Sequence, residues 1–384
     1  MPPDPVSGSP PRKLLLHVFS TFAVGGPQIR FVTIANHFGP AWRHAIIAMD
    51  GKYAARDRLG PQVDTIWPQV DMRRGDTLGN VRRFRRALRS IRPDTLVTYN
   101  WGATEWALAN ALPLVRQVHN EDGFGPEEQG SQLARRVWLR RLFLRRATVM
   151  VPSRTLYHIA TDVWRLPRRH VVYIPNGIDL SRYAANAGEA PNWPGEGPVI
   201  GTVATLRTEK NLSRLVRAVR LVRERMKVRL VIVGDGPERA PLQALAESLG
   251  IGDAVHFPGY CATPNLMYRS FDVFALSSDT EQMPLSVLEA MASGLPAAAT
   301  DVGDVRAMLA EANRPFVVQR DDAALAEAIA QLVCQPDLRR QIGAANRAKA
   351  ELEYDEDRMF RAHAALWNGA EPEAAAMAVS PPAP

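Results

Sequence analysis

Short apolar runs alternate with amphipathic segments along most of the chain, and this alternation constrains the fold more than any other feature. Buried strands that alternate with helices are typical of a parallel sheet covered by helices on its faces. The strands predicted in the first half are residues 13–19, 45–49, 95–99, 114–119, 148–152 and 171–174. The clearest helices predicted between them are residues 27–38, 78–91 and 132–146.

The same alternation starts again after residues 184–198, a stretch rich in Gly, Pro, Ala and Asn that reads as a linker. Strands are predicted at residues 199–204, 228–233, 254–258 and 273–277, with helices at 213–225, 237–249 and 284–292. Two such halves predict an α/β fold of two Rossmann-like domains that face each other across a ligand cleft.

The domain boundaries follow from these patterns. An N-terminal domain is expected over residues 12–184, a linker over 185–198 and a C-terminal domain over 199–354. Residues 355–368 form an amphipathic segment, predicted to be a helix that returns to the N-terminal domain. Residues 1–11 and 369–384 are rich in Pro or Ala and cannot build a core, so both are predicted to be disordered.

Composition agrees with a globular protein of two domains. The 384 residues are 46% hydrophobic and 23% charged, which is ordinary for such proteins. No apolar run approaches the roughly 18 residues that span a bilayer, and no secretory signal is visible at the N-terminus. The two cysteines, Cys261 and Cys334, lie in no metal-binding or redox spacing. A cytoplasmic protein is therefore expected.

Charge is distributed unevenly between the two halves. Residues 1–190 hold 27 Lys and Arg against 15 Asp and Glu, whereas the remaining residues hold 20 against 25. Much of the excess lies in two segments, from Arg82 to Arg89 and from Arg135 to Arg146, and the second also carries Trp138. Peripheral binding to the anionic inner face of the cytoplasmic membrane and the charged outer face of an ordinary helix explain this pattern equally well. Nucleic-acid binding is not expected, because no recognition motif accompanies the charge.

The most informative motif is the stretch from Ser277 to Pro296, which follows an apolar strand and opens a helix. Unpaired amides in the first turn of a helix form an anion site. Glu281 stands before this helix and Glu289 lies two turns inside it. Carboxylates accept several hydrogen bonds each, and this suits them to binding sugar hydroxyls.

This stretch resembles the donor-binding signature of glycosyltransferase family 4, retaining enzymes with the GT-B fold, and the resemblance extends over roughly residues 13–367. It implies that Glu281 contacts the transferred sugar and that Glu289 holds the ribose hydroxyls of a nucleotide-sugar donor. Gln282 occupies a position where the family usually has glycine. The backbone amides implied near the sugar and phosphates are those of Met283, Leu285 and Ser286.

The same resemblance assigns further donor contacts. Arg207 and Lys210 are implied to bind the diphosphate, where they would stabilise the negative charge that develops on the leaving group. Many relatives carry arginine at the position of Thr205. The remaining donor contacts implied are Gly234 after a strand, Tyr260 near the base, and the glycine pair Gly25 and Gly26 before the first helix.

A polar segment follows the strand predicted at residues 114–119. The resemblance gives His119 a contact with the donor sugar. Glu121 and Asp122 come next in the chain, and contact with the acceptor and simple exposure to solvent are equally compatible with them. These two carboxylates are the candidate acceptor-binding residues.

The sequence predicts a transferase that needs no metal and no cofactor. Its one Asp-x-Asp pattern, Asp355 to Asp357, starts the last predicted helix, where acids favour the positive end of the dipole. The resemblance implies a UDP- or GDP-linked donor and a lipid-linked or polysaccharide acceptor in cell-surface glycan biosynthesis. Two alternatives stay open: a nucleotide-sugar epimerase or hydrolase of the same fold, and a catalytically silent subunit that binds nucleotide sugars.

Overall fold

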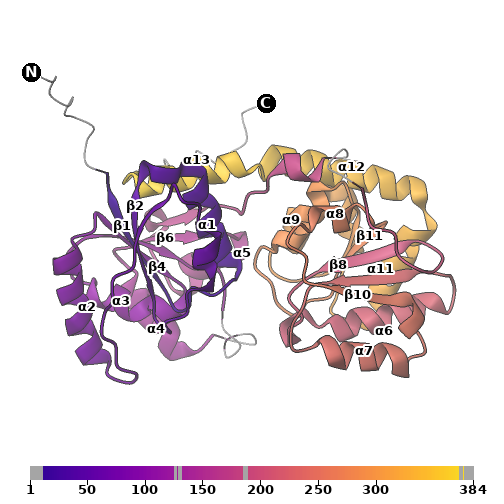
Figure 1. Ribbon diagram of the computed structural model, residues 1–384, viewed down its shortest axis with the longest axis horizontal. Helices are drawn as coiled ribbons and strands as arrows, with labels where there is room; N and C mark the ends of the chain where they lie inside the picture. Colours follow the sequence, from indigo (N-terminus) through magenta and orange to yellow (C-terminus); the bar gives the residue numbers. More distant parts are fainter. Residues whose placement is uncertain (1–11, 125–127, 129–131, 185–188, 372–374, 376–384) are drawn as a thin grey trace, which may run out of the picture. The chain divides into compact units, whose positions relative to one another are not determined.

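The computed structural model describes residues 12–124, 128, 132–184, 189–371 and 375, and it divides into two compact units (Figure 1). Of the described residues, the N-terminal unit holds those up to Val151 together with Leu156–Ile174 and those from Phe360 onward, and the C-terminal unit holds Pro152–Thr155 and those between Pro175 and Met359. The predicted disorder of residues 1–11 and of most of 369–384 lies outside the described residues, as do residues 185–188 of the predicted linker.

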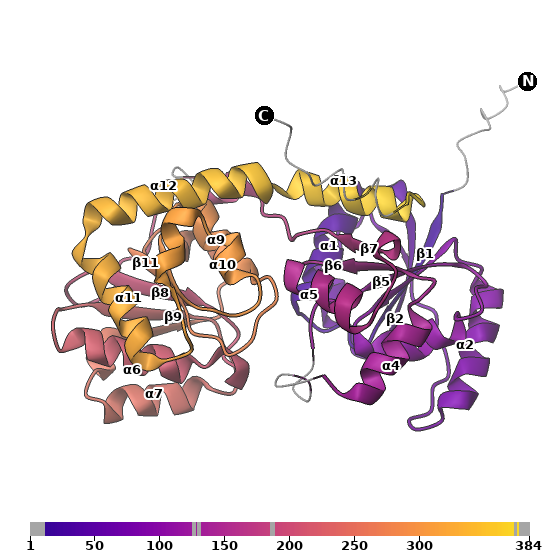
Figure 2. The ribbon, with the colours of Figure 1, turned by 180° about the vertical axis from the view of Figure 1, so that it is seen from behind.

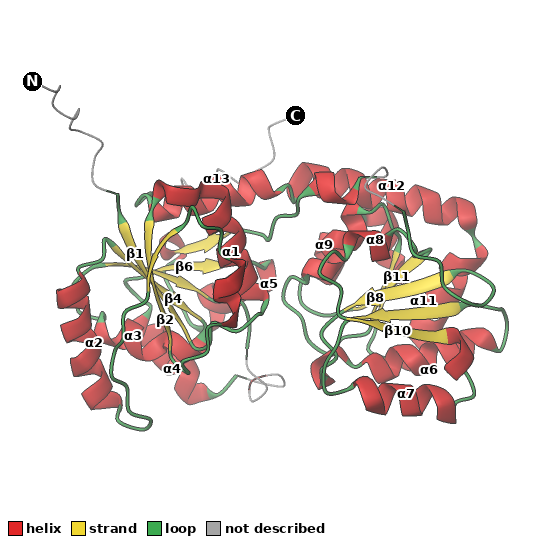
Figure 3. Ribbon diagram, viewed as in Figure 1, coloured by secondary structure: helices red, strands yellow, loops and turns green. Residues whose placement is uncertain are grey.

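The N-terminal unit is built on a parallel sheet, whose strands are yellow in Figure 3. The strand order is β3-β2-β1-β4-β5-β6-β7. Its strands are β1 (Leu14–Phe19), β2 (Arg43–Ala48), β3 (Asp64–Ile66), β4 (Thr95–Tyr99), β5 (Arg116–Asn120), β6 (Thr148–Val151) and β7 (Val171–Tyr173). Its helices include α1 (Gly26–Phe38), α2 (Thr77–Ile91), α3 (Thr104–Ala109) and α4 (Ala134–Phe143), and α5 (Arg154–His158) begins at the boundary between the two units.

Helices cover both faces of this sheet. On one face, Phe84 of α2 stacks on Trp106 of α3 with ring centroids 4.3 Å apart, and both rings are fully buried. On the other face, Phe31 of α1 and Trp367 of α13 (Glu356–Trp367) surround the buried His17 of β1. The last part of α13 therefore belongs to the N-terminal unit, as the sequence predicted.

The C-terminal unit contains a second parallel sheet, in the order β10-β9-β8-β11-β12-β13. Its strands are β8 (Val199–Val203), β9 (Arg229–Val233), β10 (Val255–Gly259), β11 (Val273–Leu276), β12 (Ala297–Thr300) and β13 (Val317–Val318). Its helices are α6 (Leu212–Arg223), α7 (Arg239–Ser248), α8 (Asn265–Tyr268), α9 (Leu285–Ala292), α10 (Val305–Met308), α11 (Asp322–Cys334) and α12 (Pro336–Glu353).

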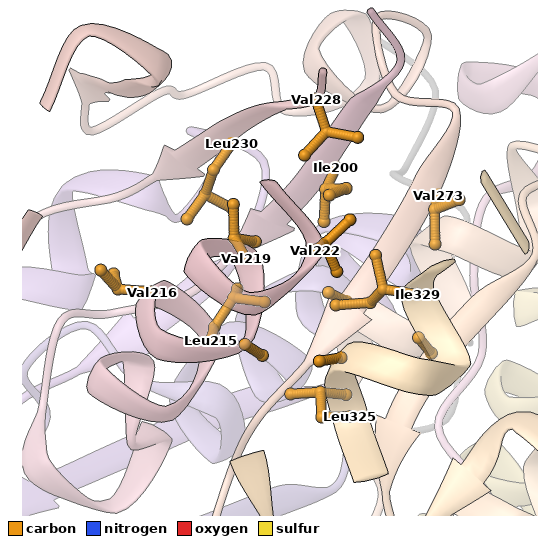
Figure 4. Packing of buried hydrophobic residues seen from close by; sticks show 14 of the residues in the cluster. Ile200, Leu215, Val216, Val219, Val222, Val228, Leu230, Val273, Leu325 and Ile329 are labelled. Carbon is orange, nitrogen blue, oxygen red and sulfur yellow. The ribbon is translucent and has the colours of Figure 1, made fainter. Parts of the chain in front are cut away.

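The core of the C-terminal unit explains why its helices form where they do. Apolar residues of α6 recur every three or four positions, so one stripe of the helix faces the sheet. Figure 4 shows Leu215, Val219 and Val222 of this stripe packed with Ile329 of α11 and Ile200 of β8. Strand β12 was not predicted, because its sequence Ala-Ala-Ala-Thr favours helix over strand and only its pairing with β11 and β13 makes it extended.

The boundary between the units lies earlier than predicted. Residues 175–184 were assigned to the N-terminal domain, but they pack in the C-terminal unit. Ile178 and Tyr183 are buried in its core, and Ile178 pairs with Asp355 in an isolated β-bridge. The boundary is set by the long-range packing of these two side chains. The Gly- and Pro-rich composition that suggested the linker carries no information about such packing.

Candidate functional site

The predicted donor residues meet where strand order reverses in the C-terminal sheet. Chain connections run in opposite directions from β8 and β11, and this switch point is where open α/β sheets bind ligands. Nζ of Lys210, after β8, lies 2.6 Å from Oε1 of Glu281, after β11. The hydroxyl of Ser278 donates a hydrogen bond of 2.7 Å to the same carboxylate oxygen. The structure thus brings together two residues 71 positions apart.

Backbone contacts hold the two loops of this site together. The amide of Asp279 donates to the carbonyl of Glu209 at 2.9 Å, and the hydroxyl of Ser277 donates to the carbonyl of Lys210 at 3.0 Å. In addition, Arg214 of α6 lies 2.8 Å from the carboxylate of Asp279. The cation and the acid of the site are therefore held by a shared framework, which limits the cost of ordering them on ligand binding.

Two glycines allow neighbouring loops to approach this closely. Gly234 has a φ of +133°, and a Cβ there would collide with the carbonyl oxygen of Ala204 in the loop after β8. Gly303 has a φ of +53°, and its Cβ would collide with the carbonyl oxygen of Glu281. Gly234 therefore permits close approach of the backbone at Ala204, and the donor contact implied for it stays a prediction.

Glu289 lies on α9 and is held by tyrosines that the sequence did not single out. The hydroxyl of Tyr268, which is fully buried, donates a hydrogen bond of 2.7 Å to Oε2 of Glu289. Burial raises the pKa of Glu289, while hydrogen bonds from Tyr268 and Tyr183 act in the opposite direction. No local pattern marks these tyrosines, because they reach Glu289 only through tertiary packing.

The start of α9 has the features of an anion site. Among the described residues, no side chain caps its N-terminus and no acid lies in its first turn, so the amides of Leu285 and Ser286 remain open to an anion. Met283 is buried, and its carbonyl accepts a hydrogen bond of 3.0 Å from Asn176. The side chain of Gln282, which replaces the usual glycine, accepts from Ser153 at 3.2 Å, so it has a structural partner.

Arg207 and Tyr260 are solvent-exposed. Arg207 follows the loop after β8 and forms no ion pair with any residue in the described part of the chain, so its guanidinium is available to an anion. Tyr260 follows β10 with 62% of its side chain exposed. Thr205, where many relatives carry arginine, is also exposed. The roles predicted for these residues stay predictions.

The N-terminal unit has a corresponding switch point between β1 and β4. Gly25 is the N-cap of α1 and Gly26 its first residue. Arg30, on the same helix, lies 2.5 Å from the carboxylate of Asp122, whose backbone amide donates a hydrogen bond of 2.7 Å to Oδ1 of Asn100. Asp122 thus pairs with the helix that begins at Gly25 and Gly26. The contact of Asp122 with an acceptor stays a prediction.

His119 and Glu121 belong to the interior of the N-terminal unit. Nδ1 of His119 lies 2.9 Å from the hydroxyl of Thr98, and its Nε2 points toward Glu121 at 3.6 Å. Glu121 is fully buried and lies 3.3 Å from Arg140 of α4. The acceptor contact predicted for Glu121 is therefore withdrawn, because its carboxylate has no open surface. His119 is 1% exposed, so this geometry gives no support to a direct contact with the donor.

Arg140 also corrects the interpretation of the basic segment from Arg135 to Arg146. Its guanidinium is 1% exposed and binds Glu128 through two hydrogen bonds of 3.0 Å, and Arg136 lies 3.1 Å from the same carboxylate. The rings of Trp101, Phe124 and Trp164 surround Arg140. These two arginines therefore stabilise the fold and do not form part of an outward basic face.

No group of three or more His, Cys, Asp or Glu side chains that could hold a metal occurs in the described part of the chain. The Asp-x-Asp pattern begins α13, where Glu356 and Asp357 occupy the first turn. The independence from metal stays a prediction. Across the described ranges, no helix is both long and apolar enough to cross a membrane.

Family models match both units. Residues 24–182 match the model described as Glycosyltransferase Family 4, and residues 186–349 match the model described as Glycosyl transferases group 1. The two matches divide the chain close to the boundary between its two sheets.

Individual relatives agree with these models. The chain is 34% identical over 167 residues to the putative glycosyltransferase EpsD of Bacillus subtilis, covering 43% of this chain and 44% of EpsD. It is 28% identical over 275 residues to a GDP-mannose-dependent alpha-mannosyltransferase of Mycolicibacterium smegmatis, covering 68% and 69% of the two chains. For most of the curated relatives it matches, the match spans about half of their length.

Solved structures share the fold along nearly the whole chain. A glycosyltransferase from Rickettsia africae superposes with a TM-score of 0.76 at 16% identity, covering 93% of this chain and 98% of the other. Anabaena HepE, in complex with UDP, superposes with a TM-score of 0.76 at 17% identity, covering 92% and 99%.

Proposed function

This chain belongs to glycosyltransferase family 4, and from that premise we propose that it transfers a sugar from a nucleoside-diphosphate sugar to a hydroxyl group, with retention at the anomeric carbon. The acceptor proposed is a lipid-linked sugar or a polysaccharide of cell-surface glycan biosynthesis. The observation that carries the proposal is the contact between Lys210 and Glu281 at the switch point of the C-terminal sheet, beside the free first turn of α9.

The proposed site separates two tasks on one framework. Lys210, Arg207 and the amides at the start of α9 would bind the diphosphate and stabilise the charge that develops as it leaves. Glu281 would accept hydrogen bonds from the hydroxyls of the transferred sugar, and Glu289 from those of the ribose. Binding of the diphosphate would draw Lys210 away from Glu281 and free that carboxylate for the sugar.

The proposed chemistry needs no protein nucleophile. In a front-face displacement, the bond between the anomeric carbon and the donor phosphate breaks while the acceptor oxygen attacks from the same side. The departing phosphate oxygen takes the acceptor proton, so the products are a glycoside and a nucleoside diphosphate. The cations at the site favour this step because they stabilise the phosphate charge that increases in the transition state.

Two donors are the first candidates. HepE has been solved with UDP-glucose bound, and a mycobacterial relative is described as GDP-mannose-dependent. Selectivity between such donors depends on details of the pocket around the base and the sugar. We therefore propose a UDP- or GDP-linked donor and include both in the test.

The test is a thermal-shift screen of the full chain against UDP-, GDP-, ADP- and dTDP-sugars in the presence of a chelator. A donor at ~100 times its dissociation constant adds about 2.7 kcal/mol to the free energy of unfolding. The shift should disappear in Glu289→Ala and persist in the control Glu247→Ala, which alters an exposed glutamate of α7 in the same unit. No shift with any donor would contradict the proposed donor site.

Incubation of the identified donor with and without acceptor separates the alternatives. Transfer with retained configuration, read by NMR of the product, supports the proposal. Isomerised donor, or free sugar formed without acceptor, would indicate an epimerase or a hydrolase. Binding without any reaction across a panel of lipid-linked and oligosaccharide acceptors would indicate a silent subunit.

A further inference from the structure

The loop that carries Glu281 is fastened on both sides of that residue. We call this loop, residues 277–284 between β11 and α9, the donor loop. Contacts with the loop after β8 hold the part before Glu281. After it, the carbonyl of Gln282 accepts a hydrogen bond of 2.9 Å from the amide of Asp304, the N-cap residue of α10. Helix α10 lies beside α9 in the C-terminal unit (Figure 2).

Asp304 joins the donor loop to a third segment of the same unit, residues 152–155 after β6. Its carboxylate accepts hydrogen bonds from the backbone amides of Arg154 and Thr155, and one of 2.7 Å from the hydroxyl of Thr155. Asp304 is 5% exposed. Hydrogen bonds to a carboxylate are stronger than those between neutral groups, so Asp304 holds the carbonyl of Gln282 at a fixed place relative to residues 152–155.

The side chain of Gln282 reaches the same segment directly. The hydroxyl of Ser153, which is fully buried, donates a hydrogen bond of 3.2 Å to Oε1 of Gln282. Gln282 is therefore joined to residues 152–155 twice, by its own side chain and through Asp304. A glycine, the residue that the family usually has here, could keep the bond between its carbonyl and Asp304. It could not form the bond to Ser153, so this second connection depends on the glutamine.

The surroundings of Gln282 leave the donor loop little room. A Cβ on Gly303 would lie 2.3 Å from the carbonyl oxygen of Glu281 and 2.7 Å from that of Gln282, so the loop after β12 lies directly against these two carbonyls. Glycine gives a loop more backbone conformations than any other residue. Gln282 therefore restricts the donor loop in two ways, by its backbone and by the bond to Ser153.

We propose that Gln282 is a positioning residue, which holds the donor loop and Glu281 in the geometry that receives the sugar donor through its bond to Ser153. The inference rests on the proposed function for the identity of the ligand. Ordering the backbone of one residue during binding weakens affinity roughly tenfold. A loop that is ordered beforehand avoids this loss. Gln282 acts through Glu281 and needs no contact with the donor.

The experiment compares Gln282→Ala, Ser153→Ala and the double variant in the full chain. Calorimetry with the identified donor should show roughly tenfold weaker binding in each single variant. Both substitutions remove the same hydrogen bond, so the double variant should also lose about tenfold, whereas independent roles would give about 100-fold. The unfolding midpoint should stay within about 2 °C of the wild type, because a role in stability alone would move the midpoint and leave affinity unchanged.

The matched control is Gln319→Ala, which removes an exposed glutamine after β13 in the same unit and should leave donor affinity unchanged. Hydrogen exchange of the free chain gives a readout that needs no donor. The amide of Asp304 should exchange faster in Gln282→Ala and Ser153→Ala, because it donates to the carbonyl of Gln282. Gln282→Glu keeps an oxygen that accepts from Ser153, so its exchange should resemble that of the wild type.

Three results would overturn the proposal. They are single variants that bind the donor within twofold of the wild type, a double variant that loses about 100-fold, and exchange at Asp304 that does not respond to Gln282→Ala. A wild-type chain that binds no donor would instead contradict the proposed function. The exchange measurement would still decide in that case whether Gln282 orders the loop, so the two failures are distinguishable.

Discussion

The parallel sheets of the two units share the same kind of strand order, which reverses at a central switch point. The two units differ in whether the polar residues near that point are accessible or buried. In the C-terminal unit, Lys210, Glu281 and Arg207 lie at loop ends where a ligand can reach them. In the N-terminal unit, His119, Glu121 and Arg140 are at most 1% exposed; Arg140 lies 3.3 Å from Glu121, whereas Nε2 of His119 and Oε1 of Glu121 have no hydrogen-bond partner among the described residues. The comparison teaches that charged residues after parallel strands do not by themselves mark a binding site, because a fold also uses them to close its interior.

The buried charges of the N-terminal unit should dominate its stability. Arg140→Ala leaves Glu121 buried without its cation and Glu128 with Arg136 alone, which should cost about 3–5 kcal/mol of unfolding free energy. Urea unfolding measures this loss. Arg141→Ala, one residue along and exposed, should change stability by less than ~0.5 kcal/mol. Similar effects from the two variants would mean that the buried network contributes little and would break the contrast between the units.

Acid should affect the two units in opposite directions. Burial lowers the pKa of His17, of His44 to about 4 and of His363 to about 3, all in the N-terminal unit. In the unfolded chain these histidines bind protons near pH 6.5, whereas in the folded chain they stay neutral. The free energy of unfolding therefore falls as pH drops from about 6.5 toward 4. With ~1.4 kcal/mol per histidine and pH unit, the loss between pH 7.5 and 5.5 is roughly 3–4 kcal/mol.

The C-terminal unit carries the opposite shifts. The pKa of Glu289 is raised by burial and that of Glu356 is raised to about 7, so their folded forms hold protons more strongly than the unfolded chain. Their contribution to stability therefore increases as pH falls toward 4.5. Hydrogen exchange, corrected for intrinsic rates and followed by mass spectrometry, should show protection lost at pH 5.5 in the N-terminal unit first. Uniform loss across both units would contradict this expectation.

Substitution of the glycines of the C-terminal site should cost more stability and more donor affinity than substitution of other glycines of the same unit. Gly234→Ala would push the loop after β8 away from its position, with a cost of about 2 kcal/mol and at least tenfold weaker donor binding. Gly250 also has a positive φ, +67°, but a Cβ there would meet nothing within 4 Å. Gly250→Ala should therefore cost about 1 kcal/mol and leave donor binding intact. Calorimetry with the identified donor measures both effects.

A substitution at Tyr268 should test the accessible site of the C-terminal unit through the carboxylate of Glu289. Tyr268→Phe removes the hydroxyl that donates to Glu289, and the pKa of that carboxyl should then rise further. Donor affinity should fall about fivefold near pH 6, as expected for the loss of one hydrogen bond of ~1 kcal/mol, and less at pH 8. A loss that is independent of pH would assign Tyr268 a role in packing only.

The smallest effect is expected at the start of α13. Glu356 is partly buried, and the carboxylates of Asp179, Asp357 and Asp355 add to the raised pKa. Glu356→Gln should raise the midpoint of thermal unfolding at pH 8, where the native carboxyl is charged, and leave it unchanged at pH 5. Because the side chain is partly exposed, the gain should stay below ~1 kcal/mol. A destabilised variant at pH 8 would show that the carboxylate makes a favourable contact.

Local patterns were enough to predict the fold class, most of the strands and the return of the last helix to the N-terminal unit, whereas Glu281, Lys210 and Arg207 were singled out by the family resemblance and their roles stay predictions. These features depend on periodicity and on turns, which short stretches of chain encode by themselves. The same patterns failed at β12, where pairing with β11 and β13 overrides the helix preference of three alanines.

Tertiary structure alone decided which polar groups face solvent. Glu121 and Asp122 are neighbours with the same charge, yet they have different partners. Glu121 is buried against Arg140 on α4, and Asp122 lies beside Arg30 on α1. In the same way, Arg140 and Arg141 differ only in the direction in which the helix turns them. Burial and partners arise from residues far along the chain, so they follow from packing, whereas the sequence by itself determined the elements that pack.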